Sequence, residues 1–252
     1  VSPTASPAVA VYASAPDVSR LEDSVEEMLA DGHTAAKLKI GFSRERDVSL
    51  MRRFRAIAGD RLGVMADANQ KWSLQEATAM IAALADFDPR FVEEPLSADA
   101  PPEDWARLAR ASAVPIAAGE NICSRRSFRE LAARGGLRVL QPDVAKWGGA
   151  SGAFAVAREA RAAGLTCAMH YMGTALGLAA SAHVLSAAGG DGPVELDVNP
   201  NPLRTELGDS DFTVTRGHIR IPRGDGIGFT PDPAALKKFS VKTADLHPRV
   251  RH

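Results

Sequence analysis

Short apolar runs alternate with amphipathic helical stretches along this chain, at a spacing of roughly 25 to 30 residues, which is typical of successive βα units. Eight runs are predicted strands: Val9–Ala13, Ala36–Ile40, Leu62–Ala66, Arg90–Val92, Pro115–Ala118, Arg138–Leu140, Thr166–Met169 and Val194–Leu196. The predicted helices between them are Val18–Ala30, Glu45–Ala58, Leu74–Ala85, Trp105–Ala111, Arg126–Arg134, Gly152–Ala163 and Ala175–Ala188. Eight parallel strands with covering helices close most simply into an α/β fold, a TIM-like (β/α)7β barrel. An open, doubly wound sheet is the alternative.

Composition indicates a soluble globular protein, either of the size of one α/β barrel or made of two small domains. The chain has 252 residues, a formal net charge of -1 and 45% hydrophobic residues, which is enough for one large core. Its Lys and Arg residues are scattered, so we expect no nucleic-acid partner.

The features that mark secreted or membrane proteins are missing from the sequence. Cys123 and Cys167 do not form a disulfide framework, and both lie in apolar surroundings. No stretch is long enough to span a membrane, and the segment beginning at Val1 does not resemble a signal peptide. We therefore expect a cytoplasmic protein without membrane contact.

Three acids each follow an apolar run, namely Asp67, Glu93 and Glu120. An acid after one strand is commonly a helix cap or a solvated loop residue. Three such acids at the carboxyl ends of parallel strands meet on the face of a barrel where catalytic groups converge. Carboxylates without Cys or His suit Mg²⁺, so the sequence predicts one magnesium site.

Two lysines lie on the second predicted strand. Side-chain alternation places Lys37 and Lys39 on the same face, and the neighbouring Ala36, Leu38 and Ile40 indicate a buried strand. Because neighbouring cations disfavour protonation, the pair predicts a lowered pKa for one lysine, as a general base requires.

The last three predicted strands also end in groups suited to proton transfer. Asp143 follows the sixth strand and His170 the seventh, so the carboxylate can orient the imidazole. Glu195 lies on the eighth strand and could donate a hydrogen bond to a substrate oxygen if it is protonated.

Together these motifs closely resemble the enolase superfamily, specifically its mandelate racemase subgroup, and the resemblance covers nearly the whole chain. The motifs are Lys37-Leu-Lys39, Asp67-Ala-Asn69, Phe91-Val-Glu-Glu-Pro95, Gly119-Glu120-Asn121, Gln141-Pro-Asp143 followed by Lys146-Trp-Gly-Gly149, and His170.

The resemblance implies a metal site and an enolising reaction. Asp67, Glu93 and Glu120 match the ligands of an essential Mg²⁺ that holds a substrate carboxylate and stabilises an enediolate. Glu94 is expected to point the other way along its strand, outside the metal shell.

The resemblance also implies two proton-transfer groups on opposite faces of the substrate. Lys39 matches one acid/base, while Lys37 matches a residue that contacts the substrate carboxylate. His170, paired with Asp143, matches the second acid/base. Glu195 matches a donor to the substrate carboxylate.

Asn69 is a further expected substrate contact, and the substrate is expected to be a small carboxylate, either a sugar acid or a 2-hydroxy acid. Acid-sugar dehydration is the expected reaction because it is the more widespread chemistry among relatives with these residues. A racemase or epimerase of a 2-hydroxy acid is the first alternative. A barrel that binds a metal or ligand without catalysis is the second.

Relatives in this family carry an N-terminal capping domain before the barrel, and this chain begins almost at the first barrel strand. The expected division is a catalytic barrel over residues 1–198 and a C-terminal loop and strand extension over residues 199–252 that would pack on a capping domain. The cap would be missing, removed or supplied by another chain. A homo-oligomer is also expected.

Overall fold

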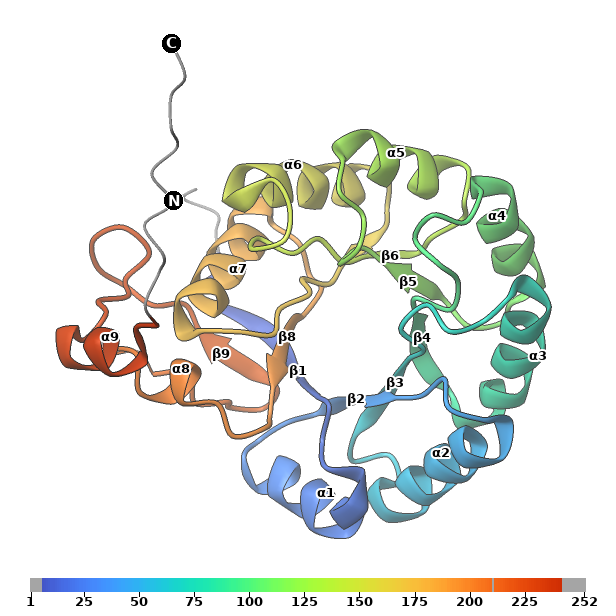
Figure 1. Ribbon diagram of the computed structural model, residues 1–252, viewed down its shortest axis with the longest axis horizontal. Helices are drawn as coiled ribbons and strands as arrows, with labels where there is room; N and C mark the ends of the chain where they lie inside the picture. Colours follow the sequence, from blue (N-terminus) through green and yellow to red (C-terminus); the bar gives the residue numbers. More distant parts are fainter. Residues whose placement is uncertain (1–5, 210, 242–252) are drawn as a thin grey trace.

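Eight parallel strands form a closed ring in the computed structural model, which describes residues 6–209 and 211–241 (Figure 1). Their hydrogen-bonded order is β7-β6-β5-β4-β3-β2-β1-β8. The bounds are β1 Ala8–Ser14, β2 Ala35–Lys39, β3 Gly63–Asp67, β4 Pro89–Glu93, β5 Ile116–Ala118, β6 Val139–Leu140, β7 Thr166–Cys167 and β8 Val194–Asp197. A parallel bridge between Met169 and Val194 closes the ring, so the open-sheet alternative is wrong and the barrel is confirmed.

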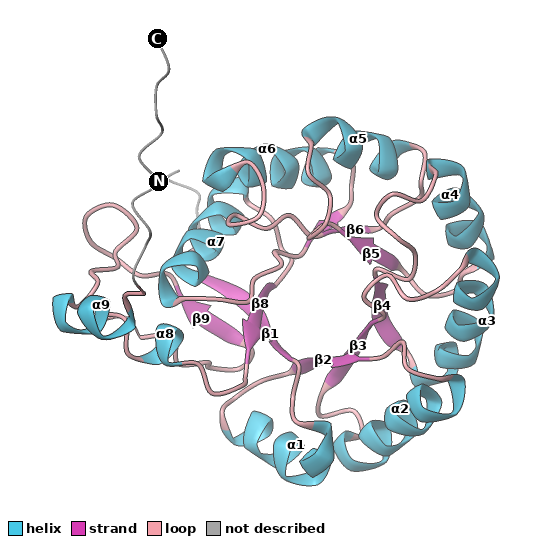
Figure 2. Cartoon of the chain, in the orientation of Figure 1, coloured by secondary structure: helices cyan, strands magenta, loops and turns pink. Residues whose placement is uncertain are grey.

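The helices lie outside the ring (Figure 2). They are α1 Leu21–Ala30, α2 Arg44–Ala58, α3 Leu74–Leu84, α4 Pro102–Ala111, α5 Arg125–Ala133, α6 Gly149–Ala162 and α7 Ala175–Ala188. Hydroxyl side chains cap several of them, and Ser73 forms a reciprocal capping box with Glu76 at α3. Each predicted helix is present; α7 has the predicted bounds, and the others are shifted at one end or both. For example, α4 begins at Pro102, because proline suits the first turn of a helix.

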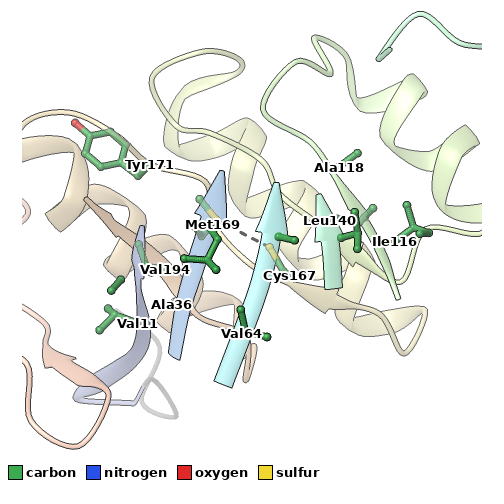
Figure 3. Close-up of a cluster of buried hydrophobic side chains, with 14 of the residues drawn as sticks. Val11, Ala36, Val64, Ile116, Ala118, Leu140, Cys167, Met169, Tyr171 and Val194 are labelled. Carbon is green, nitrogen blue, oxygen red and sulfur yellow. Dashed lines mark hydrogen bonds between the residues drawn. The ribbon is translucent and has the colours of Figure 1, made fainter. Parts of the chain in front are cut away.

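Side-chain alternation divides each strand between two cores. Outward side chains pack under the helices, and several of them, including Val11, Val64 and Leu140, are drawn in Figure 3. Inward side chains form a separate buried layer that fills the barrel: Tyr12, Ala35, Met65, Phe91, Ala117, Val139 and Ala168. This layer is the apolar floor on which the groups at the carboxyl ends of the strands rest.

After β8 the chain leaves the βα pattern, as the sequence predicted. The segment contains α8 Pro202–Thr205, β9 His218–Arg220 and α9 Pro233–Phe239, and β9 pairs antiparallel with β1. Its packing on a capping domain stays a prediction, and its last residues, 242–252, lie outside the described residues. Within the described chain, no helix combines the length and apolar character needed to cross a membrane.

Gly119 offers a test of how tightly β5 and β6 are packed at the site. A Cβ at Gly119 would lie 2.3 Å from the carbonyl carbon and oxygen of Gln141, which are backbone atoms that cannot move independently. We expect Gly119→Ala to reduce the free energy of unfolding by about 1–3 kcal/mol, as overpacking does. The measurement is urea unfolding.

Gly63→Ala is the matched control, since the nearest atoms that its Cβ would meet belong to the flexible side chain of Arg90. An equal loss of stability in both variants would contradict the packing argument.

Candidate active site

A ring of polar side chains lies one layer above the apolar floor. Each member follows a floor residue by two positions, so alternation turns it to the same inward face. The members are Ser14, Lys37, Asp67, Glu93, Gln141 and His170, and all are buried. Asp143 and Glu195, which the sequence also predicted, are buried at the same ends of the strands. The structure therefore brings the predicted site residues together.

The two lysines of β2 both contact Asp67. The distances from Asp67 Oδ2 are 3.5 Å to Lys37 Nζ and 2.5 Å to Lys39 Nζ. Lys37 has no exposed side-chain surface, whereas 30% of the Lys39 side chain is exposed. Lys39 is therefore the lysine that a molecule entering the barrel mouth can reach.

Lys37 is held as a cation by the acids around it. Burial alone would lower the pKa of Lys37, but the carboxylates of Glu195 and Glu93 raise it well above its ordinary value. Their oxygens lie 2.8 and 2.7 Å from Lys37 Nζ. Lys37 is thus a fixed positive charge, because its nearest partners are acids from β4 and β8.

Glu93 is enclosed by donors from two other strands. Lys37 Nζ lies 2.7 Å from both carboxylate oxygens, and Gln141 Nε2 donates to Oε2 at 2.5 Å. Burial raises the pKa of Glu93 to about 8, with Asp67 and Glu195 adding to the increase and Lys37 opposing it. Gln141 was noticed in the sequence only as part of a motif, without a role.

His170 lies between two carboxylates. Its Nδ1 is 2.6 Å from Asp143 Oδ2, as predicted, and its Nε2 contacts Glu120 Oε2. Burial lowers the pKa of His170, but hydrogen bonds to Asp143 and Glu120 outweigh it and raise the pKa to about 10. The imidazole is therefore protonated at neutral pH in this arrangement, and the pKa of Glu120 is lowered in return.

Glu195 accepts hydrogen bonds from three strands or loops. Ser14 Oγ donates to Oε1, Lys37 Nζ lies 2.8 Å from the same oxygen, and the Tyr171 amide donates to Oε2 at 3.3 Å. Burial opposes ionisation, but Lys37 and His170 lower the pKa of Glu195. Glu195 is therefore ionised here, whereas the sequence prediction required a protonated group. Ser14 was missed because a serine within a strand carries no signal of its own.

Glu94 departs from the expected strand geometry. The strand ends at Glu93, and Glu94 has a left-handed φ of 41°, so simple alternation does not apply to it. Its carboxylate accepts from Asn121 Nδ2 at 3.0 and 2.9 Å, and the same nitrogen donates to Glu120 Oε1 at 3.0 Å. Burial raises the pKa of Glu94 to about 7, and the charge of Glu120 adds to this.

Asn69 lies against a predicted ligand. The backbone N–H of Asn69 donates to Asp67 Oδ1 at 2.8 Å, and its side-chain Nδ2 donates to Asp67 Oδ2 at 3.2 Å. Its predicted contact with substrate stays a prediction.

A cavity of about 640 Å³ lies between Lys39 and helix α1. Phe42, Arg46 and Asn199 line it, and the Arg46 guanidinium lies 3.9 Å from the centre of the Phe42 ring. This cavity gives a small molecule access to the lysine.

The acids of the site suit a hard divalent cation. Among the described residues, no group of three or more His, Cys, Asp or Glu side chains is already arranged to hold a metal ion. Asp67, Glu93 and Glu120 nevertheless come from β3, β4 and the end of β5, and each faces a cationic side chain. Oxygen donors with surplus buried negative charge are the set that Mg²⁺ prefers, so the residues fit the predicted metal.

Comparisons with known proteins agree with this geometry. The arabinonate dehydratase of Saccharolobus solfataricus is 27% identical over 233 residues, which cover 92% of this chain and 62% of that protein. A solved mandelate racemase/muconate lactonizing enzyme from Bordetella bronchiseptica RB50 is 43% identical with a TM-score of 0.88, over 93% of this chain and 66% of that one. The chain thus spans about two thirds of the length of these proteins.

A second solved structure bears on the metal. It is a racemase from Streptomyces coelicolor A3(2) with bound magnesium, 28% identical with a TM-score of 0.85, over 95% of this chain and 65% of that one. The model of the family described as enolase C-terminal domain-like matches residues 20–235. With its barrel, its acids at successive strand ends and this match over most of its length, the chain belongs to the enolase C-terminal domain-like family.

Proposed function

We propose that this chain holds the active site of a Mg²⁺-dependent enzyme that removes the α-proton of a small carboxylate, and that acid-sugar dehydration is its reaction. One observation carries the proposal. Three acids at the ends of neighbouring strands lie between Lys39 on one side and the His170–Asp143 pair on the other. The similarity to an arabinonate dehydratase supports a sugar acid as substrate.

Asp67, Glu93 and Glu120 would hold the metal. When bound, Mg²⁺ supplies a positive charge that fixes the substrate carboxylate and makes its α-proton more acidic. Lys37 adds a second fixed positive charge beneath this position, since it is buried and its pKa is raised. Asp67 is further oriented by two hydrogen bonds from Asn69.

Lys39 and His170 would serve opposite faces of the substrate. In the ring, β1 and β8 separate β2 from β7 on one side, and β3 to β6 separate them on the other. Lys39 lies at the exposed mouth and takes the α-proton. His170, oriented by its contact with Asp143, would donate a proton to the departing β-hydroxyl.

A racemase is the second candidate, because the same two groups can exchange the α-proton between faces. The likeness to a magnesium-containing racemase favours this alternative specifically. A screen of sugar acids and 2-hydroxy acids with Mg²⁺ distinguishes the two reactions. Dehydration yields a 2-keto acid, whereas racemisation yields exchange of the α-hydrogen in D₂O without loss of substrate.

Glu93→Gln tests the metal assignment. The variant keeps the shape of the side chain and removes one anionic metal ligand. Mg²⁺ affinity should therefore fall by more than about 100-fold, which is a larger loss than that caused by removing a residue that only supports a ligand. Isothermal titration with Mg²⁺ measures this. Glu76→Gln, on the surface of α3, is the control, and an unchanged affinity in Glu93→Gln would refute the assignment.

Lys39→Arg tests the first proton-transfer group. Arginine preserves the charge but cannot release its proton, so exchange of the α-hydrogen from one face should fall by about 10²- to 10⁴-fold. Proton NMR of each substrate stereoisomer in D₂O follows the exchange. Lys237→Arg on α9 is the control. Retained exchange from both stereoisomers would exclude Lys39 from this role.

His170→Asn tests the second group. The substitution should stop net dehydration or racemisation, yet leave Lys39 able to exchange the α-hydrogen of one stereoisomer, because that step needs a single base. The same NMR experiment measures it. Asp143→Asn should slow the reaction by a smaller factor, since the imidazole loses only its orienting partner. Loss of exchange from both isomers in a folded, Mg²⁺-binding His170→Asn protein would contradict the two-face assignment.

A further inference from the structure

The side-chain amide of Asn121 connects two carboxylates. Its Nδ2 donates to Glu120 Oε1 at 3.0 Å and to the two oxygens of Glu94 at 3.0 and 2.9 Å. An amide nitrogen has two hydrogens, so both are committed to acids. With an acceptor on either side, the amide can only present its nitrogen to them, which fixes the orientation of the side chain.

Glu94 is a rigid anchor for this amide. It is 1% exposed, its backbone N–H donates to the Ala117 carbonyl at 2.9 Å, and its carbonyl accepts from the Gln70 N–H at 2.7 Å. A left-handed φ of 41° is unusual for a residue with a side chain and persists only when the surroundings enforce it. The main chain therefore fixes where the Glu94 carboxylate lies.

A gain in the stability of the fold does not explain the carboxylate of Glu94. A buried acid is costly unless a cation or several donors compensate it. Within residues 6–209 and 211–241, no Lys, Arg or His nitrogen lies within 4.0 Å of Glu94, and Asn121 is its side-chain hydrogen-bond donor. The arrangement does, however, hold Asn121 against Glu120.

Glu120 depends on this support because it extends from a loop. Strand β5 ends at Ala118, so Glu120 lies beyond the regular ladder. Its Oε2 contacts His170, while its Oε1 accepts from Asn121 and lies 3.4 Å from the ammonium group of Lys146, whose side chain is 43% exposed. Asn121 thus fixes the position of Glu120 Oε1, independently of the contact between His170 and Oε2.

We infer that Glu94 and Asn121 are positioning residues for the metal ligand Glu120, acting as a carboxylate–amide–carboxylate relay. The inference rests on the proposed function, since it takes Glu120 to be a ligand of Mg²⁺. It assigns a role to Glu94, which strand alternation had placed outside the metal shell. Groups that orient metal ligands set metal affinity without touching the metal.

Mg²⁺ binding to the full-length protein tests the relay, measured by isothermal titration and confirmed with Mn²⁺ by electron paramagnetic resonance. Asn121→Leu and Glu94→Leu each should weaken Mg²⁺ binding by about 10- to 100-fold, as loss of a supporting hydrogen bond does. Glu94→Gln should restore affinity to near the wild-type value, because its carbonyl oxygen still accepts from the Asn121 amide. Asn121→Ala replaces Asn121→Leu if circular dichroism shows that the leucine variant is unfolded.

Ser124→Ala is the matched control. It removes the cap of α5 in the same loop, where Ser124 Oγ accepts from the Ser127 N–H at 3.0 Å, without contacting a ligand. We expect a lower Tm and unchanged Mg²⁺ affinity, which separates loosening of the loop from loss of positioning. Mg²⁺ affinity within two-fold of wild type in a folded Asn121 variant would overturn the relay. Failure of the wild-type protein to bind Mg²⁺ would overturn the proposed function, and the relay with it.

Discussion

Lys37 is the charge on which the site depends. With no exposed surface, its Nζ lies 2.7 Å from Glu93, 2.8 Å from Glu195 and 3.5 Å from Asp67, so one ammonium group ties β2 to β3, β4 and β8. Such a cluster is costly to bury, because each charge loses its hydration. The barrel tolerates it because the apolar floor and the outer core contribute the stability that the polar ring does not.

Acidic side chains outnumber basic ones in this ring. The basic side chains that meet here are Lys37, Lys39 and His170, and Lys146 lies 3.4 Å from Glu120. The acids are more numerous: Asp67, Glu93, Glu94, Glu120, Asp143 and Glu195. Burial raises the pKa of Glu93, and the neighbouring acids Asp67 and Glu195 add to this increase, so the site favours an added cation near these oxygens.

The sequence was sufficient to predict the parts of this structure that depend on local periodicity. Alternation within the second strand placed Lys37 and Lys39 on one inward face, and in the structure both contact Asp67. It failed for Glu94, because the strand ends one residue earlier and the backbone turns into a left-handed conformation that the pattern does not show. The partners of Lys37 were equally inaccessible, since Glu93 and Glu195 are distant in sequence.

Each predicted metal ligand is already in contact with a group that would bind substrate or transfer a proton. Asp67 contacts Lys39, Glu93 contacts Lys37, and Glu120 contacts His170. Under the proposed function, a divalent cation held by these acids would offset part of their negative charge and so weaken their attraction for the ammonium and imidazolium groups. Metal binding would then loosen the contacts that hold Lys39 and His170 to their acids. In this site, the cation that would activate the substrate would also free the side chains that act on it.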